Sequence, residues 1–96
     1  MSDRDMILDK AKALINTDRA NEYGDALLMH QSIADGWNVI VRKSETTHGF
    51  ITPSHVALMM DWLKTCRLLN KLDHEDSWAD KCGYTALGGE MSKQEP

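Results

Sequence analysis

The fold expected for this chain is decided by residues 51–71, which read ITPSHVALMMDWLKTCRLLNK. Thr52 and Pro53 mark the start of a helix, because threonine is a good N-cap and proline is favoured at the first helical position. Apolar side chains then recur on more than one side of this helix: Val56, Met59, Met60 and Leu63 with Arg67 on one side, and Leu58, Trp62 and Leu69 on another. This arc is wider than a surface helix requires, so we expect a central helix over about residues 53–71.

Three further helices are predicted around the central one. Apolar spacing near 3.6 residues predicts helices over about 3–16 and about 26–42, the second beginning after Asp25. The last helix is expected to end at the pair of glycines 88–89. Its inward stripe is predicted as Trp78, Ala79, Cys82 and Ala86. These elements predict an all-α fold, a single small helical bundle of four to five helices over residues 1–90 with a frayed tail over 91–96.

Several side chains are expected inside this bundle. We expect the large apolar residues Met59, Met60, Trp62, Leu63 and Trp78 to be largely buried. Cys66 and Cys82 do not form a CxxC pair, and both are predicted to be buried free thiols. Apolar residues on several faces of the helices also predict a homodimer or a higher homo-oligomer.

The composition limits the function. The chain has 96 residues, of which 42% are apolar and 27% are charged. This is enough for one compact core, with a radius of about 12–13 Å, and too little for the large enzyme folds. A formal charge of −4 disfavours nonspecific nucleic-acid and membrane-surface binding. No apolar run is long enough to span a bilayer and no signal peptide is evident, so a cytoplasmic protein is expected.

The first candidate site is the charged loop over residues 18–25, just before a predicted helix. Arg19 could bind an anion there, while Glu22 and Asp25 could supply oxygen ligands to a divalent cation. The structural alternative is a capping turn, in which Asp25 bonds the helix amides and Arg19 pairs with a neighbouring carboxylate.

The second candidate site combines two helices. Asp76 and Asp80 lie one turn apart on the last helix, and Asp61, Lys64 and Arg67 lie on the central helix. Like charges at this spacing repel, so we expect the pair either to be offset by Lys64 or Arg67 or to bind a metal. Asp76 alternatively serves as the N-cap, and Asp80 is expected to be partly buried beside a cationic partner.

Other catalytic signals are absent from the sequence. The four histidines have no zinc-site spacing, and no nucleophile, P-loop or dinucleotide motif occurs. No zinc and no organic cofactor are therefore expected. The three tryptophans are interpreted as core anchors and not as platforms for stacking bases.

The motifs together resemble a family of short phage and prophage proteins known only as a domain of unknown function. The resemblance covers about residues 6–91. It rests on the following motifs: Arg19-x-x-x-Tyr23-Gly24-Asp25, Ile33-Ala34-x-x-Trp37, Ile51-Thr52-Pro53, Leu63-Lys64-x-x-Arg67, and Asp76-x-x-x-Asp80-x-x-Gly83-Tyr84. More distantly, the chain is similar to phage nucleotide-modification-associated domains and to the MazG-like all-α nucleoside triphosphate pyrophosphohydrolases.

This resemblance implies a phage-encoded, nucleotide-handling protein. The phosphate-binding residues would be Arg19, Tyr23, Lys64 and Arg67, and the Mg²⁺ ligands would be Glu22, Asp25, Asp61, Asp76 and Asp80. The chain carries Asp61-x-x-Lys64 where MazG-like enzymes carry Glu-x-x-Glu, and a lysine cannot ligate Mg²⁺. Binding or sequestering a nucleotide therefore remains open, with or without hydrolysis.

The alternative function is that of a non-enzymatic accessory protein. Such a protein would bind and inhibit a host defence or metabolic protein through an acidic helical surface, in the cytoplasm of the infected bacterium. The placement of the carboxylates discriminates between the two functions. Convergence on one concave site favours the nucleotide, whereas dispersal over a convex surface favours a protein partner.

Overall fold

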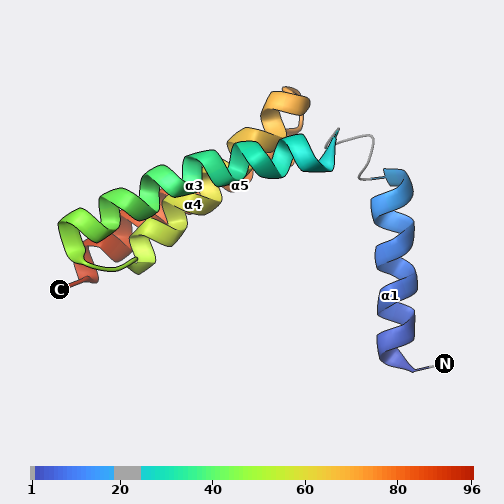
Figure 1. Ribbon diagram of the computed structural model, residues 1–96, viewed down its shortest axis with the longest axis horizontal. Coiled ribbons are helices and arrows are strands. Elements are labelled where there is room, and N and C mark those ends of the chain that lie inside the picture. Colours follow the sequence, from blue (N-terminus) through green and yellow to red (C-terminus); the bar gives the residue numbers. More distant parts are fainter. Residues whose placement is uncertain (1, 19–24) are drawn as a thin grey trace.

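The computed structural model describes residues 2–18 and 25–96 and is helical almost throughout (Figure 1). The elements are α1 (Asp3–Ala13), a π-helical turn η1 (Leu14–Asp18), α3 (Ala26–His48), α4 (Pro53–Asn70) and α5 (Glu75–Gln94). None of the described residues forms a strand. The all-α prediction is confirmed. The second predicted helix is longer than expected, because α3 continues until Gly49, whose φ of 81° is accessible to glycine.

The helix α4 begins where Thr52 and Pro53 predicted. The backbone N–H of Thr52 donates to Nδ1 of His55 at 3.0 Å. The carboxylate of Glu95, at the far end of α5, accepts from the backbone N–H of Ser54 at 2.6 Å and from its hydroxyl at 2.8 Å. The end of α5 therefore completes the N-terminal cap of α4, and the prediction of a frayed tail over residues 91–96 is wrong.

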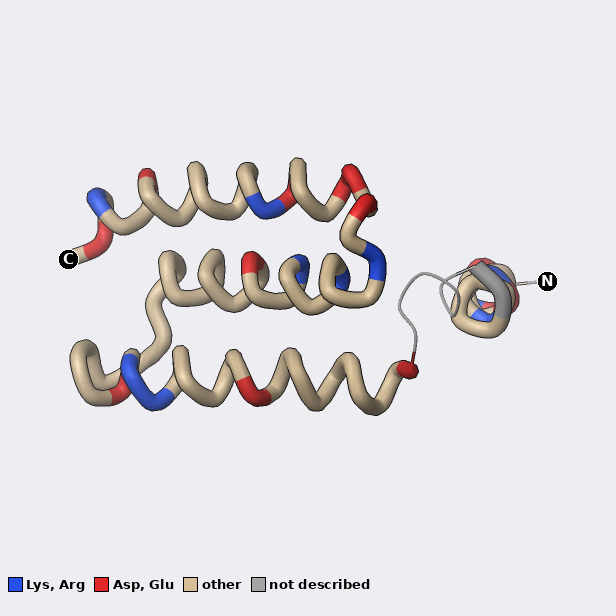
Figure 2. The backbone as a smooth tube through the Cα atoms, turned by 90° about the horizontal axis from the view of Figure 1, so that it is seen from above, with Lys and Arg blue, Asp and Glu red and all other residues tan. Residues whose placement is uncertain are grey.

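The helices α3, α4 and α5 lie side by side in one layer (Figure 2). The middle helix, α4, packs against both neighbours, whereas α3 and α5 do not contact each other. The prediction of a central helix is therefore confirmed. None of the helices in the described part of the chain is long and apolar enough to cross a membrane.

Large apolar side chains hold α3 against α4. Met29, Ile33 and Cys66 are buried, and Trp37, Trp62 and Leu63 pack around them. Each indole donates a hydrogen bond across the interface: Trp37 to the carbonyl of Met59 at 2.7 Å and Trp62 to the carbonyl of Ser32 at 2.9 Å. The contact between α3 and α4 requires glycine at position 36, because a Cβ there would overlap the ring of Trp62.

Small side chains hold α4 against α5. Ala57 and Ser77 are buried, and a Cβ at Gly88 would lie 2.9 Å from that of Ala57. The side of α5 that faces α4 consists of residues that are buried or half-buried, and two of them, Tyr84 and Met91, also line the pocket between the helices. These residues are Ser77, Lys81, Tyr84, Gly88 and Met91.

The predicted inward stripe of α5 is therefore wrong. Trp78 is 51% exposed, and Ala79, Cys82 and Ala86 are exposed as well. The prediction followed the apolar residues, but close approach of two helices requires small residues at the contact. The helix also runs through the glycines at 88 and 89 to Gln94, because glycine weakens a helix without necessarily ending it. Trp78 instead donates its indole N–H to the carbonyl of Leu72, at 2.8 Å, across the α4–α5 turn.

The core is smaller than predicted. Its buried apolar residues are Met29, Ile33, Ala57, Cys66 and Leu68. The residues Met59, Met60, Trp62 and Leu63 are only half-buried, because a single layer leaves both faces of α4 open. Cys66 is a buried free thiol whose pKa is raised by desolvation, whereas Cys82 is exposed, contrary to the prediction.

The helix α1 stands apart from the layer (Figure 1). Among the described residues it contacts only η1, and none of its side chains is buried. The first predicted helix therefore exists over Asp3–Ala13, but its apolar stripe has no partner in the described part of the chain. A single domain over residues 1–90 stays a prediction.

Candidate functional site

Six of the nine predicted site residues lie in the described part of the chain. Arg19, Glu22 and Tyr23 lie outside the described residues. Asp25 precedes α3, and its carboxylate accepts from the backbone N–H of Leu28 at 3.0 Å. The capping alternative for Asp25 is thus confirmed.

One ion pair joins two of the predicted residues across α4 and α5. Nζ of Lys64 lies 2.9 Å from Oδ2 of Asp80, and their side chains are 12% and 48% exposed. The hydrogen bond from Lys64 lowers the pKa of Asp80 against the opposing effect of desolvation, and the charges of Lys64, Arg67 and His74 lower it further. The expected cationic partner of Asp80 is therefore present, although the carboxylate is about half exposed.

A second ion pair occupies Asp61. Its Oδ1 lies 2.9 Å from Nζ of Lys81, which also donates to the hydroxyl of Thr65 at 2.5 Å. Asp61 and Lys81 are 30% and 22% exposed. This pair ties the same two helices together, and its lysine was not among the predicted site residues. The spacing of Lys81 from the small residues Ser77 and Gly88 is the signal that could have placed it at the interface.

Asp76 lies in the first turn of α5 and is exposed. The N-cap of that helix is His74, whose Nδ1 accepts from the backbone N–H of Ser77 at 3.3 Å, so the N-cap alternative for Asp76 is wrong. Asp76 stands instead beside Glu75, where both carboxylates interact favourably with the helix dipole.

The described residues do not form a magnesium centre. Mg²⁺ needs several oxygen ligands in octahedral geometry. Asp61 and Asp80 are each paired with a lysine, and no three acidic, histidine or cysteine side chains gather within the described ranges. The donor set between α4 and α5 does not by itself fit the metal. The predicted magnesium site stays a prediction that depends on Glu22.

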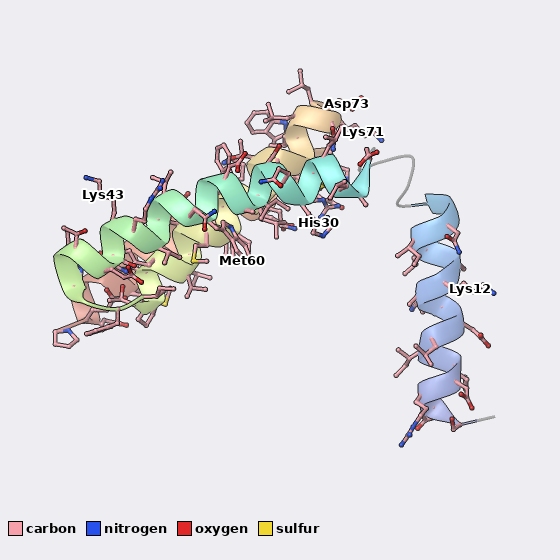
Figure 3. The ribbon with its side chains drawn as sticks, viewed as in Figure 1. Lys12, His30, Lys43, Met60, Lys71 and Asp73 are labelled. Atoms are coloured by element: carbon pink, nitrogen blue, oxygen red, sulfur yellow. The ribbon has the colours of Figure 1, made fainter. Side chains whose placement is uncertain are left out.

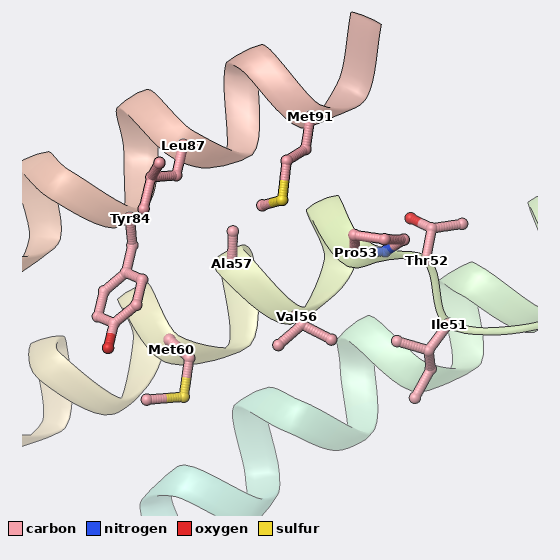
Figure 4. A pocket seen from close by; sticks show the side chains of 9 residues that line it. All are labelled: Ile51, Thr52, Pro53, Val56, Ala57, Met60, Tyr84, Leu87 and Met91. Carbon is pink, nitrogen blue, oxygen red and sulfur yellow. The ribbon is translucent and has the colours of Figure 1, made fainter. Parts of the chain in front are cut away.

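Sequence reasoning missed an apolar groove between α4 and α5 (Figure 4). This α4–α5 groove has a volume of about 560 Å³. Its lining comes from the α3–α4 connection and from both helices: Ile51, Thr52, Pro53, Val56, Ala57, Met60, Tyr84, Leu87 and Met91. The signal was the spacing of Tyr84, Leu87 and Met91, which share one side of a helix.

A second depression, the α3–α4 groove, lies on the other face of the layer. Leu58 follows Val56 by two residues, which turns it about 200° around the helix and away from the first groove. Two pockets of about 380 and 130 Å³, which have no lining residue in common, lie along this groove. Its lining includes Asp25, Leu28, Ser32, Gly36, Val39, Leu58, Asp61, Trp62 and Leu69.

Comparisons with known proteins identify the family. Residues 6–92 match the family described as "Domain of unknown function (DUF6378)". The chain is 37% identical over 89 residues to the Gene 55 protein of Mycobacterium phage L5, a match that covers 93% of this chain and 54% of that protein. The chain thus spans about half the length of this curated relative. No solved structure matches. The chain therefore belongs to the DUF6378 family of proteins of unknown function, and its relative in a mycobacteriophage places it among phage proteins.

Proposed function

We propose that this protein is a phage accessory protein that acts by binding a host protein through the acidic end of α5. Asp73, Glu75 and Asp76 lie within four residues of one another at the α4–α5 turn, and all three are exposed. Asp73 and its neighbour Lys71 lie at the end of the layer nearer α1 (Figure 3). None of the three carboxylates forms an ion pair with another described residue, so this end carries unneutralised negative charge.

The contrast with Asp61 and Asp80 carries the proposal. Those two carboxylates lie between α4 and α5, where lysines neutralise them. The acids at the turn are exposed and line neither of the two grooves described above. A concentrated negative surface of this kind accelerates association with a basic protein surface and rejects anionic partners.

The test uses tagged protein recovered from host cells, with bound proteins quantified by mass spectrometry. A triple variant, Asp73→Asn, Glu75→Gln and Asp76→Asn, removes the acidic end. The control, Asp9→Asn, Asp35→Asn and Glu45→Gln, removes the same charges from exposed positions elsewhere. We expect the wild type to recover one host protein in equimolar amount, and high salt to release that protein. The recovered amount should fall at least tenfold with the first variant and stay unchanged with the control. Equal retention by both variants would refute the proposal.

A second candidate function is binding of a nucleotide phosphate at α4. Its support is the ion pair of Lys64 with Asp80, together with the positive charges of Arg67 and His74, which also lower the pKa of that carboxylate. A phosphate could compete with this carboxylate for Lys64 and Arg67, whose side chains bind phosphate through charge-assisted hydrogen bonds.

A thermal-shift panel of nucleotides, each with and without Mg²⁺, separates the two functions. A nucleotide at 100 times its Kd adds about 2.7 kcal/mol of apparent stability. Nucleotide binding predicts such a shift, its loss in Lys64→Ala, and loss of any Mg²⁺ dependence in Asp80→Asn. The accessory function predicts that no nucleotide shifts the melting temperature of the wild type.

We further propose that the protein is a homodimer. Stable domains are built from at least two packed layers, whereas α3–α5 form only one. Exposed apolar residues lie on both faces of this layer, including Val56 on one side of α4 and Leu58 on another. A second copy would provide the missing layer.

A further inference from the structure

The chain exposes more surface than a compact protein of its mass. Its accessible surface is 7163 Å², whereas a folded monomer of 10.9 kDa exposes about 5,600 Å². Its radius of gyration is 16.1 Å, against about 12.5 Å for a compact chain of this length. The excess, about 1,600 Å², is roughly twice what each partner contributes to a standard protein interface. A second copy can therefore be accommodated without unfolding any helix.

All residues of α1 contribute to this exposed surface, since none of them is buried. This helix has a well-formed start, because the hydroxyl of Ser2 accepts from the backbone N–H of Asp5 at 3.3 Å. Its length of 11 residues is nevertheless marginal for an isolated helix in water. Its apolar stripe consists of Ile7, Leu8 and Ala11, continued by Leu14 and Ile15 in η1. The side chains of Ile7, Leu8 and Ile15 are 68%, 64% and 64% exposed. The stripe needs a partner surface.

The α3–α4 groove matches this stripe in its apolar character. Its exposed apolar side chains include Leu28, Val39, Leu58 and Leu69. The charged residues that line it are the two carboxylates Asp25 and Asp61. Both carboxylates are already engaged, Asp25 in the cap of α3 and Asp61 with Lys81, so the match with the α1 stripe is one of apolar surfaces.

We infer that α1 of each copy packs into the α3–α4 groove of a second copy, so that two chains exchange their first helices. The inference rests on the homodimer proposed above and names the segment that forms it. The position of α1 away from its own layer favours a second copy as its partner (Figure 1). Exchange of an identical element closes a two-fold dimer with two equivalent contacts. Each layer of three helices then receives a fourth helix on one face.

Mass measurement with a matched pair of substitutions tests the contact. Light scattering of the full chain should give twice 10.9 kDa. Ala11→Asp places a charge within the stripe, and Ala13→Asp places the same charge on the opposite side of α1, at an equally exposed position. We expect the dimer dissociation constant to rise at least tenfold in Ala11→Asp and to change less than twofold in Ala13→Asp.

Disulfide trapping shows which copy provides the helix. In a Cys82→Ser background, chains with Ile7→Cys are mixed with chains carrying Leu58→Cys, and oxidation should link one of each. Leu87→Cys, in the α4–α5 groove, serves as the control and should not link to Ile7→Cys.

Three outcomes would overturn the inference. A monomeric wild type at micromolar concentration removes both the homodimer and the exchange. A dimer that tolerates Ala11→Asp and forms no Ile7→Cys to Leu58→Cys link keeps the homodimer but refutes the exchange. A chain carrying both cysteines that closes its disulfide within a monomer shows docking on its own layer. Binding of a host protein by the acidic end is measured separately and fails or stands independently.

Discussion

The two interfaces of α4 use different kinds of contact. Toward α3, the contact consists of large apolar side chains, with two tryptophans that also bond backbone carbonyls. Toward α5, small residues allow close approach, and two lysine–aspartate pairs cross at its edges. The first interface depends on the shape of buried rings, whereas the second depends on the absence of bulk and on charge. Side-chain truncation, added volume and pH should therefore affect the two interfaces differently.

The largest contrast is expected between two tryptophans. Trp62 packs on the α3–α4 core and donates to Ser32, so Trp62→Ala should reduce the free energy of unfolding by about 3 kcal/mol. Trp78 is 51% exposed, and Trp78→Ala should cost about 1 kcal/mol or less. Urea unfolding of both variants measures this difference. Equal losses would show that the assigned register of α5 is incorrect.

The next largest changes in the free energy of unfolding are expected when a methyl group is added at a glycine. Gly36→Ala forces a methyl group into the ring of Trp62 and should cost about 2 kcal/mol, despite the better helix propensity of alanine. Gly89→Ala meets open space within α5 and should instead stabilise the protein by about 0.5–1 kcal/mol. Gly88→Ala should fall between them, since its neighbour Ala57 must give way. The same unfolding experiment ranks the three variants, and a neutral Gly36→Ala would contradict the close contact with Trp62.

The smallest effect concerns pH and the α4–α5 interface. The pKa of Asp80 is lowered in the folded protein, chiefly by its hydrogen bond from Lys64. Its ion pair therefore contributes stability above the unfolded pKa of about 3.9, and this contribution is lost as the pH falls through the lower, folded value. Asp80→Asn should be less stable than the wild type at pH 7, and the difference should shrink below about pH 4. It should also shrink in high salt, since Asp80 is half exposed.

Exposure of the thiols provides one more comparison of α4 with α5. Cys66 is buried against α3 and its pKa is raised, so a thiol reagent should modify it only when the layer opens. Cys82 is exposed on α5 and should react in the folded protein. Mass spectrometry after brief labelling should therefore find one modified cysteine, and labelling of Cys66 at the same rate would show that the α3–α4 interface is open.

Local signals predicted the helices well. Asp25 and Thr52 were recognised as the residues before two helices, because capping depends on hydrogen bonds within a few residues. The central position of α4 followed from the width of its apolar arc, since a helix with two neighbours must present apolar side chains to both. The end of α5 was predicted incorrectly, because a glycine pair is compatible both with a helix end and with close helix packing.

The candidate site was predicted only in part. The carboxylates Asp76 and Asp80 are expected either to be offset by Lys64 or Arg67 or to bind a metal, and the structure shows the pairing of Asp80 with Lys64. The partner of Asp61 was missed, because the inward face of α5 had been assigned to Trp78 and its apolar neighbours. The apolar groove beside Tyr84 was missed for the same reason. Whether Arg19, Glu22 and Tyr23 join these residues stays a prediction.

By itself, the sequence determined the all-α class, the starts of α1, α3 and α4 and the central place of residues 53–70, because caps and helical periodicity act over one or two turns. The tertiary structure decided which side of α5 faces α4 and which lysine neutralises Asp61. It also decided that, among the described residues, α1 contacts none of the helices α3, α4 and α5. These features depend on which surfaces meet, and small residues such as Ser77 and Gly88 carry no apolar signal of their own. Their contribution arises only when a second helix approaches closely enough to use the space that they leave.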